Sequence, residues 1–395
     1  MLQPLKGVRV ARVSTTLLFV ITNLADQLLL LDRAGANLSI ITKPDAHAQS
    51  MISRLQFKFK YIPIKIYRPI RLIADLFALF RLIYIFKKER FDIVHSVTPK
   101  AGLLCAIAAK VVGVPVRLHT FTGQVWANSS GIKRQILVWC DQLIGRLNTH
   151  CYADSPSQRD FLLSEKIISH SDITVLGSGS LAGVNLERWN PQLFSKVDKD
   201  SIRCGLKIAQ DTQVLLFLGR INREKGIYDL IDSLLQLKQK KLNVVLLVVG
   251  LFETGAEDSV RQYAKKSCQD SVIFTGFCSD PEKYMAVADI LCLPSSREGF
   301  GSVVIEASAM ELPVVATNIY GLTDAVIDGE TGILVEPHNV SKLTCAIERL
   351  LNDNSLRFSI QKKAKHRVVK EFTSEHLGEL MINQYVKQIN ATKNT

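Results

Sequence analysis

The stretch QVLLFLGRINREKGIYDLIDSLLQLKQK, residues 213–240, decides the fold class. It begins with a short apolar run, passes through a charged turn and continues with apolar residues at helical spacing. A strand followed in this way by a helix is the repeating unit of a parallel sheet. Further strand-like apolar runs follow at 244–250, 271–276, 289–295, 313–317 and 332–337. The second half of the chain therefore predicts a Rossmann-like α/β domain.

The same alternation fills the first half. Strands are expected at 8–13, 38–42, 91–96 and 115–121, and helices at 21–35, 69–89 and 101–113. A chain of 395 residues also exceeds the roughly 250–300 residues at which one core stops growing. We expect an α/β protein with two Rossmann-like domains, 1–190 and 191–372, joined by a polar linker at 190–201. The sequence also predicts a last helix within 373–395. Packing of this helix back against the first domain is one alternative, and packing against the second is the other.

Positive charge is concentrated in the first half. The net charge is +12, and residues 1–190 hold 24 Lys and Arg against 12 Asp and Glu. Residues 54–90 hold ten of these basic residues against two acids. For 70–86 two interpretations stay open, a core helix with basic residues toward solvent or an interfacial helix. We expect 54–71 to contact an anionic membrane surface, where each basic residue contributes about 1 kcal/mol.

Several classes of protein are disfavoured. The eight cysteines form no CxxC pair or zinc-type spacing, which is typical of reduced thiols in a cytosolic protein. No run of about 18 apolar residues predicts a membrane span. No nucleic-acid recognition module is present, and the first strand is not followed by the GxGxxG of a dehydrogenase. The one D-x-D, at 198–200, lies in the expected linker, so no metal or other cofactor is implied.

The turn GRINREKG (219–226) places Gly219, Arg220 and Lys225 between a strand and a helix. Free backbone N–H groups and the helix dipole already favour anions at a helix N-terminus. The two basic side chains predict a diphosphate clamp there. The alternative is two exposed charges in a turn.

A second loop, SREGFGSVVIE (296–306), has a carboxylate on each side of two glycines. Gly299 and Gly301 allow backbone amides to approach a ligand closely. Glu298 and Glu306 can accept bonds from vicinal hydroxyl groups. Together these residues suit a nucleotide sugar, although an acid in the first turns of a helix is often only a partner of the dipole.

These motifs resemble those of retaining glycosyltransferase family 4. SREGFGSVVIEASAMELPVVAT matches the family's E-x7-E pattern, GRINREKG its Arg and Lys motif, and GLTDAVIDGETGILVEP (321–337) the following stretch. The resemblance implies the GT-B fold, with two Rossmann-like domains across a cleft. It implies that Arg220 and Lys225 hold the donor diphosphate, Glu298 the hexose and Glu306 the ribose. It further implies backbone contacts with the sugar by Gly299, Phe300 and Gly301, a place for Phe277 beside the base, and a donor contact by Gly219.

The first half is similar to bacterial O-antigen and capsule assembly transferases. HSVTPKAGLLCAIAAK, RLHTFTGQVW, LNTHCYADSPSQRDFL and VLGSGSLAGVNLERW carry this similarity. It implies transfer of a hexose, or of N-acetylgalactosamine, from a UDP-sugar to an undecaprenyl-diphosphate-linked saccharide at the inner face of the bacterial inner membrane. Many members have a histidine that contacts the donor sugar where this chain has Thr122, so Thr122 is expected to supply a hydroxyl group there instead. No Gly-Gly pair follows the first strand, where Ser14, Thr15 and Thr16 stand, and Ser14 and Thr15 are expected to contact the acceptor.

The acceptor site is predicted from single residues. Lys100 begins a helix after a strand and suits a lipid diphosphate, with Lys133 and Arg134 nearby in sequence. Trp126 is expected either to stack on a sugar or to pack in the core. Two other functions stay open, a nucleotide-sugar-binding paralogue without turnover and a UDP-sugar epimerase.

Overall fold

The computed structural model describes residues 3–45, 48, 51–52 and 55–393. The chain forms two compact units: unit 1 comprises Met1–Gly183 and Ser374–Thr395, and unit 2 comprises Val184–Thr373. The expected linker at 190–201 is wrong, because these residues lie inside unit 2. They form a 3-10 turn (Pro191–Leu193) and the start of helix α8 (Lys196–Gly205). Ser195 and Asp198 close a capping box at the start of α8, which turns the polar run into a helix.

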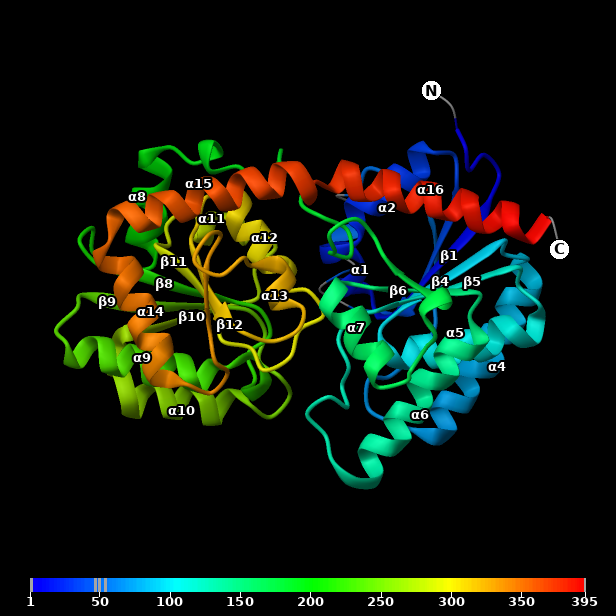
Figure 1. The fold of residues 1–395 in the computed structure, drawn as a ribbon, viewed down its shortest axis with the longest axis horizontal. Helices are drawn as coiled ribbons and strands as arrows, with labels where there is room; N and C mark the ends of the chain where they lie inside the picture. The colour runs from blue at the N-terminus through cyan, green and yellow to red at the C-terminus, as the bar shows by residue number, and fades with distance from the viewer. Residues whose placement is uncertain (1–2, 46–47, 49–50, 53–54, 394–395) are drawn as a thin grey trace. The chain divides into compact units, whose positions relative to one another are not determined.

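Within its described residues, unit 1 has a seven-stranded parallel sheet with the order β3-β2-β1-β4-β5-β6-β7 (Figure 1). The strands are β1 (Arg9–Thr16), β2 (Asn37–Lys43), β3 (Lys60–Pro63), β4 (Ile93–Val97), β5 (Val116–Phe121), β6 (His150–Ala153) and β7 (Ile173–Val175). The helices are α1 (Leu17–Asn23), α2 (Ala25–Arg33), α4 (Leu72–Glu89), α5 (Pro99–Val112), α6 (Gly131–Leu147), α7 (Pro156–Ser164) and α16 (Ser374–Lys393).

Alternating strand residues supply the cores on the two faces of this sheet. Val10 of β1 belongs to the core beneath α1, α2 and α16, whereas Ala11 and Val13 face the core beneath α4 and α5. Phe121 of β5 and Cys151 of β6 face a third core, which Ile144 of α6 completes. Because both faces of a parallel sheet are covered, its strands are near-continuous apolar runs, which is why the sequence pattern located them.

The first strand and its helix differ from the prediction. β1 continues through Ser14 and Thr15 to Thr16, and helix begins at Leu17 instead of residue 21. The expected helix 21–35 is split into α1 and α2 at Leu24. β-branched Val13, Thr15 and Thr16 favour an extended backbone, which explains the longer strand.

A buried polar cluster joins α16 to this sheet. Arg12 of β1 is fully buried, and its Nη1 donates to the Tyr385 hydroxyl and to Nδ1 of His95, each at 2.8 Å. Because Nδ1 accepts, Nε2 of His95 carries the proton and donates to the Thr120 hydroxyl at 2.8 Å. Burial, and then the charge of Arg12, lowers the pKa of His95. His95 is therefore a neutral link between β1, β5 and α16.

Unit 2, which the structure describes throughout, has a six-stranded parallel sheet with the order β10-β9-β8-β11-β12-β13 (Figure 1). The strands are β8 (Gln213–Leu218), β9 (Val244–Val249), β10 (Val272–Gly276), β11 (Ile290–Leu293), β12 (Val314–Thr317) and β13 (Ile333–Val335). The helices after α8 are α9 (Ile227–Gln239), α10 (Glu257–Cys268), α11 (Glu282–Met285), α12 (Ser302–Ala309), α13 (Leu322–Ala325), α14 (Val340–Asn352) and α15 (Asn354–Glu371). Two cores, one on each face, bury the apolar residues of its strands.

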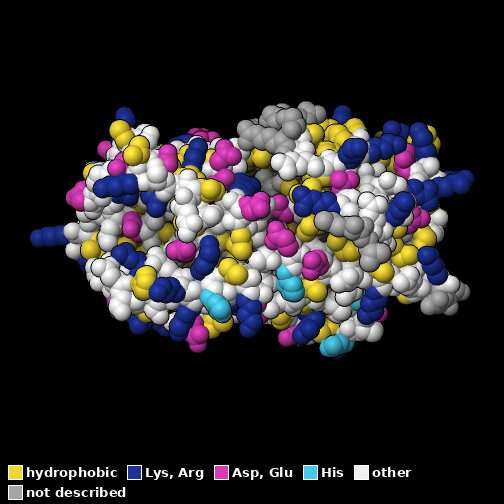
Figure 2. Space-filling model, turned by 90° about the horizontal axis from the view of Figure 1, so that it is seen from above, with side chains coloured by type: hydrophobic (Ala, Val, Ile, Leu, Met, Phe, Trp, Pro, Cys, Tyr) yellow, Lys and Arg dark blue, Asp and Glu magenta, His cyan; other side chains and the backbone are white. Residues whose placement is uncertain are grey.

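Two surface properties follow from the side chains. Among the described residues, no helix has both the length and the apolar character needed to cross a bilayer. Figure 2 shows basic side chains interspersed with acidic ones over the face seen there. The excess of positive charge therefore does not form a single basic patch on that face.

Candidate functional site

The two charged loops of unit 2 leave neighbouring strands at the same edge of the sheet. β8 pairs with β11, with Leu215 opposite Ile290 and Leu216 opposite Leu291. The loop after β8 leads through a 3-10 turn, Arg223–Lys225, into α9, and the loop after β11 leads into α12. This is the carboxyl edge of a parallel sheet, where ligands bind in open α/β folds.

Two glycines let the loops come together. Gly226 has φ +74°, and a Cβ at this position would lie 2.1 Å from the carbonyl oxygen of Pro294 in the other loop. Gly301 has φ +84° and is the N-cap residue of α12. A side chain would be strained at either position, because L-residues seldom adopt these angles. The loop contact therefore requires glycine in the sequence.

Lys225 and Glu298 meet between the loops. The Lys225 ammonium forms an ion pair with Oε1 of Glu298, and both side chains are largely buried. The Ser295 hydroxyl donates to the same Oε1 at 2.9 Å. The backbone N–H of Lys225 donates to Oδ1 of Asn222 at 2.9 Å, which fixes the turn. One cation and one carboxylate of the predicted site are thus held as a pair.

A second set of contacts ties the same loops. Arg297 forms an ion pair of 2.5 Å with Glu224. The backbone N–H of Ser296 donates to the carbonyl oxygen of Glu224 at 2.8 Å. These bonds bring consecutive residues of one loop against consecutive residues of the other. The positions of Lys225 and Glu298 are therefore set by backbone contacts as well as by their own ion pair.

Arg220 is more exposed than Lys225. Its guanidinium lies 3.8 Å from the Glu253 carboxylate, and both side chains are substantially exposed. Gly219, before it, has φ +150° at the end of β8. An exposed pair of this kind is weak, so Arg220 is able to exchange its partner for an anionic ligand.

Glu306 lies in the second turn of α12, below Gly301. Burial raises the pKa of its carboxyl to about 7; the charge of Arg188 lowers this pKa, and Glu282 raises it further. Arg188 itself binds Glu282 at 3.0 Å and donates to the carbonyl oxygen of Ser279 at 2.9 Å. Sequence reasoning missed Arg188, since nothing in the local pattern connects it to residues about 90 and 120 positions later.

The two aromatic donor candidates differ in environment. Phe300 is buried, and its ring lies 5.3 Å from that of Phe372 in the core. Any contact of Phe300 with a ligand must therefore come from its backbone, as the resemblance implied. Phe277 follows β10 and is half-buried.

In unit 1, Thr122 follows β5 at the carboxyl edge of the sheet and is half-buried. His119 is buried and bonded through Nδ1 to the Ser96 hydroxyl at 2.9 Å. Burial lowers the pKa of His119 to about 3. His119 therefore does not substitute for a histidine at position 122. Ser14 and Thr15, at the end of β1, are buried strand residues rather than parts of an open loop.

The basic acceptor candidates already have partners or lie in solvent. Lys100, in the first turn of α5, forms an ion pair of 2.7 Å with Asp75 and donates to the carbonyl oxygen of Pro69 at 2.6 Å. Arg134 pairs with Glu165 at 2.7 Å, and Lys133 is exposed on α6. A phosphate at Lys100 would have to compete with Asp75.

Trp126 packs in the core. Its side chain is 1% exposed, it stacks on Phe161 with 5.3 Å between the ring centres, and Arg134 lies over the ring. Its Nε1 donates to Asp141 at 2.7 Å. No ring face is open to a sugar, so the packing alternative describes Trp126.

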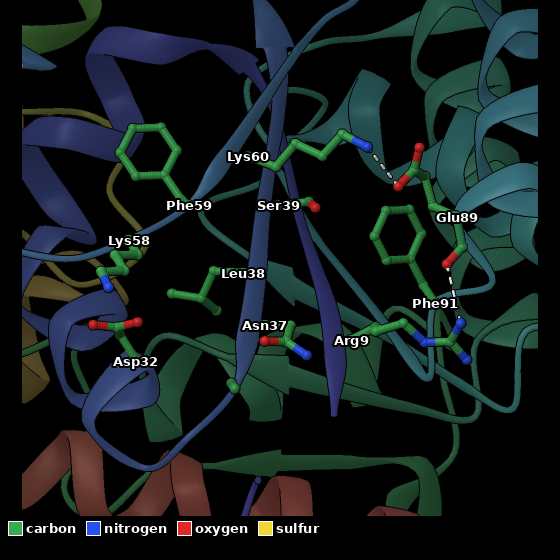
Figure 3. A pocket seen from close by; sticks show the side chains of 11 residues that line it. Arg9, Asp32, Asn37, Leu38, Ser39, Lys58, Phe59, Lys60, Glu89 and Phe91 are labelled. Carbon is green, nitrogen blue, oxygen red and sulfur yellow. Dashed lines mark hydrogen bonds and ion pairs between the residues drawn. The ribbon is translucent and has the colours of Figure 1, made fainter. Parts of the chain in front are cut away.

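An open depression of about 540 Å³ lies on the other edge of the unit 1 sheet (Figure 3). Arg9, Asn37 and Lys60, which line it, are the first residues of β1, β2 and β3. Lys60 pairs with Glu89 at 2.7 Å, and Arg9 donates to the carbonyl oxygen of Glu89 at 3.3 Å. It therefore lies away from the carboxyl edge that carries Thr122.

The fold is of the GT-B type, with two Rossmann-like units, and the charged loops of unit 2 are suited to a phosphorylated ligand with hydroxyl groups. Residues 198–367 match the family model described as glycosyl transferases group 1. Residues 21–179 match that of the glycosyl transferase 4-like domain. The chain belongs to this family of glycosyltransferases.

The capsular polysaccharide biosynthesis glycosyltransferase CapM of Staphylococcus aureus is 35% identical over 82% of this chain and 83% of its own length. An Escherichia coli protein named UDP-Gal:alpha-D-GlcNAc-diphosphoundecaprenol alpha-1,3-galactosyltransferase is 25% identical over 77% of this chain and 78% of its own. Among solved structures, HepE of Anabaena in complex with UDP and glucose has a TM-score of 0.82 at 18% identity, covering 96% of this chain and 100% of that one. This last likeness concerns the fold.

Proposed function

We propose that this enzyme transfers a sugar from a UDP-sugar to an undecaprenyl-diphosphate-linked saccharide in capsule or O-antigen assembly, with N-acetylgalactosamine as the sugar. The observation that supports it best is the paired Lys225 and Glu298 between two loops at one sheet edge. The names of two relatives add support, since one is a capsule transferase and the other uses a diphosphoundecaprenol acceptor.

On the donor side, Arg220 and Lys225 bind the diphosphate beside the first turn of α9, where backbone N–H groups also favour anions. Glu298 accepts bonds from hexose hydroxyl groups and Glu306 from the ribose. Gly219, Gly299, Phe300 and Gly301 contribute backbone contacts, Phe277 flanks the base, and Thr122 supplies a hydroxyl group near the sugar.

Transfer retains the anomeric configuration. A departing diphosphate oxygen accepts the proton of the attacking acceptor hydroxyl on the same face, while the bond from the anomeric carbon to that diphosphate breaks. Preorganised positive charge on the leaving group is then the main catalytic contribution. Since Arg220 and Lys225 supply this charge, we propose that no metal is required, and that transfer persists in a chelator. Loss of transfer in EDTA that returns with Mg²⁺ would contradict this.

The acceptor binds at the carboxyl edge of the unit 1 sheet. Lys100, Lys133 and Arg134 are proposed to contact its diphosphate, while Ser14 and Thr15 are buried in the strand that ends at the same edge. The enzyme works as a peripheral protein at the inner face of the bacterial inner membrane, where such acceptors are made.

Mass spectrometry of the lipid product tests this function. Purified protein is mixed with undecaprenyl-diphosphate-linked N-acetylglucosamine and, in separate reactions, with common UDP- and GDP-sugars. A gain of one N-acetylhexosamine with UDP-N-acetylgalactosamine alone supports donor and acceptor together, and NMR of the product gives the anomeric configuration. No product with any donor, despite measurable UDP binding, would favour the binding-only paralogue. Conversion of the UDP-sugar without acceptor would favour an epimerase.

A further inference from the structure

One face of α4 in unit 1 exposes large apolar side chains. Leu72 is 80% exposed, Phe77 73% and Phe80 60%. The other members of this apolar face are Ile70, Ile73, Leu76 and Tyr84. The opposite side of the helix packs in the core through Ala78, Leu82, Ile85 and Phe86. α4 is therefore apolar on both sides, which a helix at a purely aqueous surface is not.

A second exposed apolar stripe lies on α6. Ile132, Ile136 and Trp139 follow one another at helical spacing and are all more than half exposed. α5 packs against both α4 and α6, and its residues 101–109 are buried or half-buried. The outer surface of this helical layer is therefore formed by α4 and α6, which lie on the same side of the sheet in Figure 1.

The α6 stripe lies in the half of its helix nearest the carboxyl edge of the sheet, and the α4 face begins at that edge and extends along most of its helix. Each helix follows a parallel strand, β3 or β5, so its first turns are closest to the carboxyl end of that strand. The exposed apolar residues occupy 70–84 around α4 and 132–139 of α6. This is the edge that carries the proposed acceptor residues.

The charge around the α4 face has one sign. Lys65, Arg71 and Arg81 are exposed beside it. The acid within this stretch, Asp75, is bonded to Lys100 at 2.7 Å and is mostly buried. A large apolar face bordered by cations fits the interface of an anionic bilayer, with the apolar side chains among the acyl chains and the basic ones at the headgroups.

We infer that the exposed face of α4, extended by the α6 stripe, is the surface with which this enzyme docks on an anionic lipid bilayer. This surface overlaps the expected contact at 54–71 at its end, through Lys65, Ile70 and Arg71. It is centred on α4 instead, since Phe57, Ile64 and Ile66 are buried in the core and Arg54 lies outside the described residues. The inference rests on the proposed function in one respect, because a lipid-linked acceptor brings the enzyme to such a surface.

Vesicle flotation of the full chain tests the docking surface. The wild type should float with vesicles of phosphatidylethanolamine and phosphatidylglycerol and much less with phosphatidylcholine alone. Phe77→Gln/Phe80→Gln should lower the partition coefficient by about tenfold or more, because two large apolar groups lose their burial in lipid. Ile132→Gln/Trp139→Gln should lower it similarly. Arg71→Gln/Arg81→Gln should remove part of the preference for anionic lipid.

The matched control replaces apolar side chains of comparable exposure elsewhere, Val197→Gln/Phe358→Gln in unit 2, which are 76% and 57% exposed. Equal flotation of the Phe77/Phe80 and control variants would overturn the inference. So would a wild type that ignores vesicles but forms a dimer that the Phe77/Phe80 change dissociates. Transfer to detergent-solubilised acceptor is measured in parallel. Absence of transfer there refutes the proposed function, while flotation judges the docking surface independently.

Discussion

Replacing Lys225 by alanine tests the site most directly. Lys225 and Glu298 are 19% and 12% exposed and form an ion pair between two loops. If Lys225 binds the leaving diphosphate, its loss removes one preorganised charge, which costs about 10²–10³ in turnover, or about 2.7–4 kcal/mol. The same change leaves the Glu298 carboxylate without its cation. That should lower stability by about 1–3 kcal/mol, and each kcal/mol lowers Tm by about 2–4 °C in a domain of the size of unit 2.

A second variant separates the effect of Lys225→Ala on turnover from its effect on stability. Lys225→Ala/Glu298→Gln removes the stranded charge, so it should recover Tm but not turnover. Lys240→Ala breaks the exposed ion pair of Lys240 with Glu348 in the same unit, and serves as the matched control. Turnover is measured as radiolabelled sugar transferred to lipid at saturating donor. A near-normal rate in Lys225→Ala, or a loss no larger than that of Lys240→Ala, would refute the assignment of Lys225.

Three further predictions concern other parts of the chain. Burial raises the pKa of Glu306 to about 7, so the folded state holds this proton more tightly than the unfolded state and loses stability as pH rises through 7. Glu306→Gln should therefore raise Tm at pH 8 and change it little at pH 4, and equal shifts at both would contradict this. UDP affinity, by calorimetry, should rise from pH 6 to 8 in the wild type but not in this variant. Gly226→Ala should lower Tm by several degrees and weaken UDP binding, because a Cβ at this position has no room. Gly205→Ala is the control, since its Cβ would meet nothing within 4 Å. Similar changes of Tm and of UDP affinity in the two variants would refute the loop contact. Tyr385→Phe removes the hydroxyl that accepts from the buried arginine of β1. It should lower the free energy of unfolding, measured by urea denaturation, by about 1–3 kcal/mol. Tyr228→Phe, whose hydroxyl bond is exposed, should change this free energy little, and equal effects of the two variants would contradict the role of the buried cluster.

The fold was predictable because both sheets are parallel and buried on both sides. The strands of unit 2 fall within the predicted apolar runs, and β9, for example, is one residue shorter than its run at 244–250. The sequence-based predictions failed where a helix cap or a β-branched polar residue, and not the apolar pattern, determines the local backbone. The polar run at 190–201 suggested a linker, but a capping box makes part of it helical. Thr15 and Thr16 are polar yet β-branched, and they continue β1.

The candidate site was predictable only where its residues share a short motif. Arg220 and Lys225 lie in one turn, and Glu298 and Glu306 in one loop and helix. Arg188, in contrast, reaches Glu282 across 94 positions, and no spacing rule predicts such a contact. Burial is equally hard to foresee for a single side chain. Trp126 and Phe300 lie in loops, and only the packing shows that their rings are covered.

The pairing of Lys225 with Glu298 bears on how the donor enters. Both groups are assigned to different parts of the donor, yet each is the other's partner here. A sugar alone offers no charge to replace the Lys225 ammonium, so it has to bind Glu298 while the ion pair persists. On the proposed donor assignment, a diphosphate replaces Glu298 as the partner of Lys225, which frees Oε1 from the ion pair for hydroxyl groups. Because Arg297 and Glu224 hold the loops together, this exchange needs only side-chain rotation. If this assignment holds, the nucleotide part of the donor prepares the sugar part of the site.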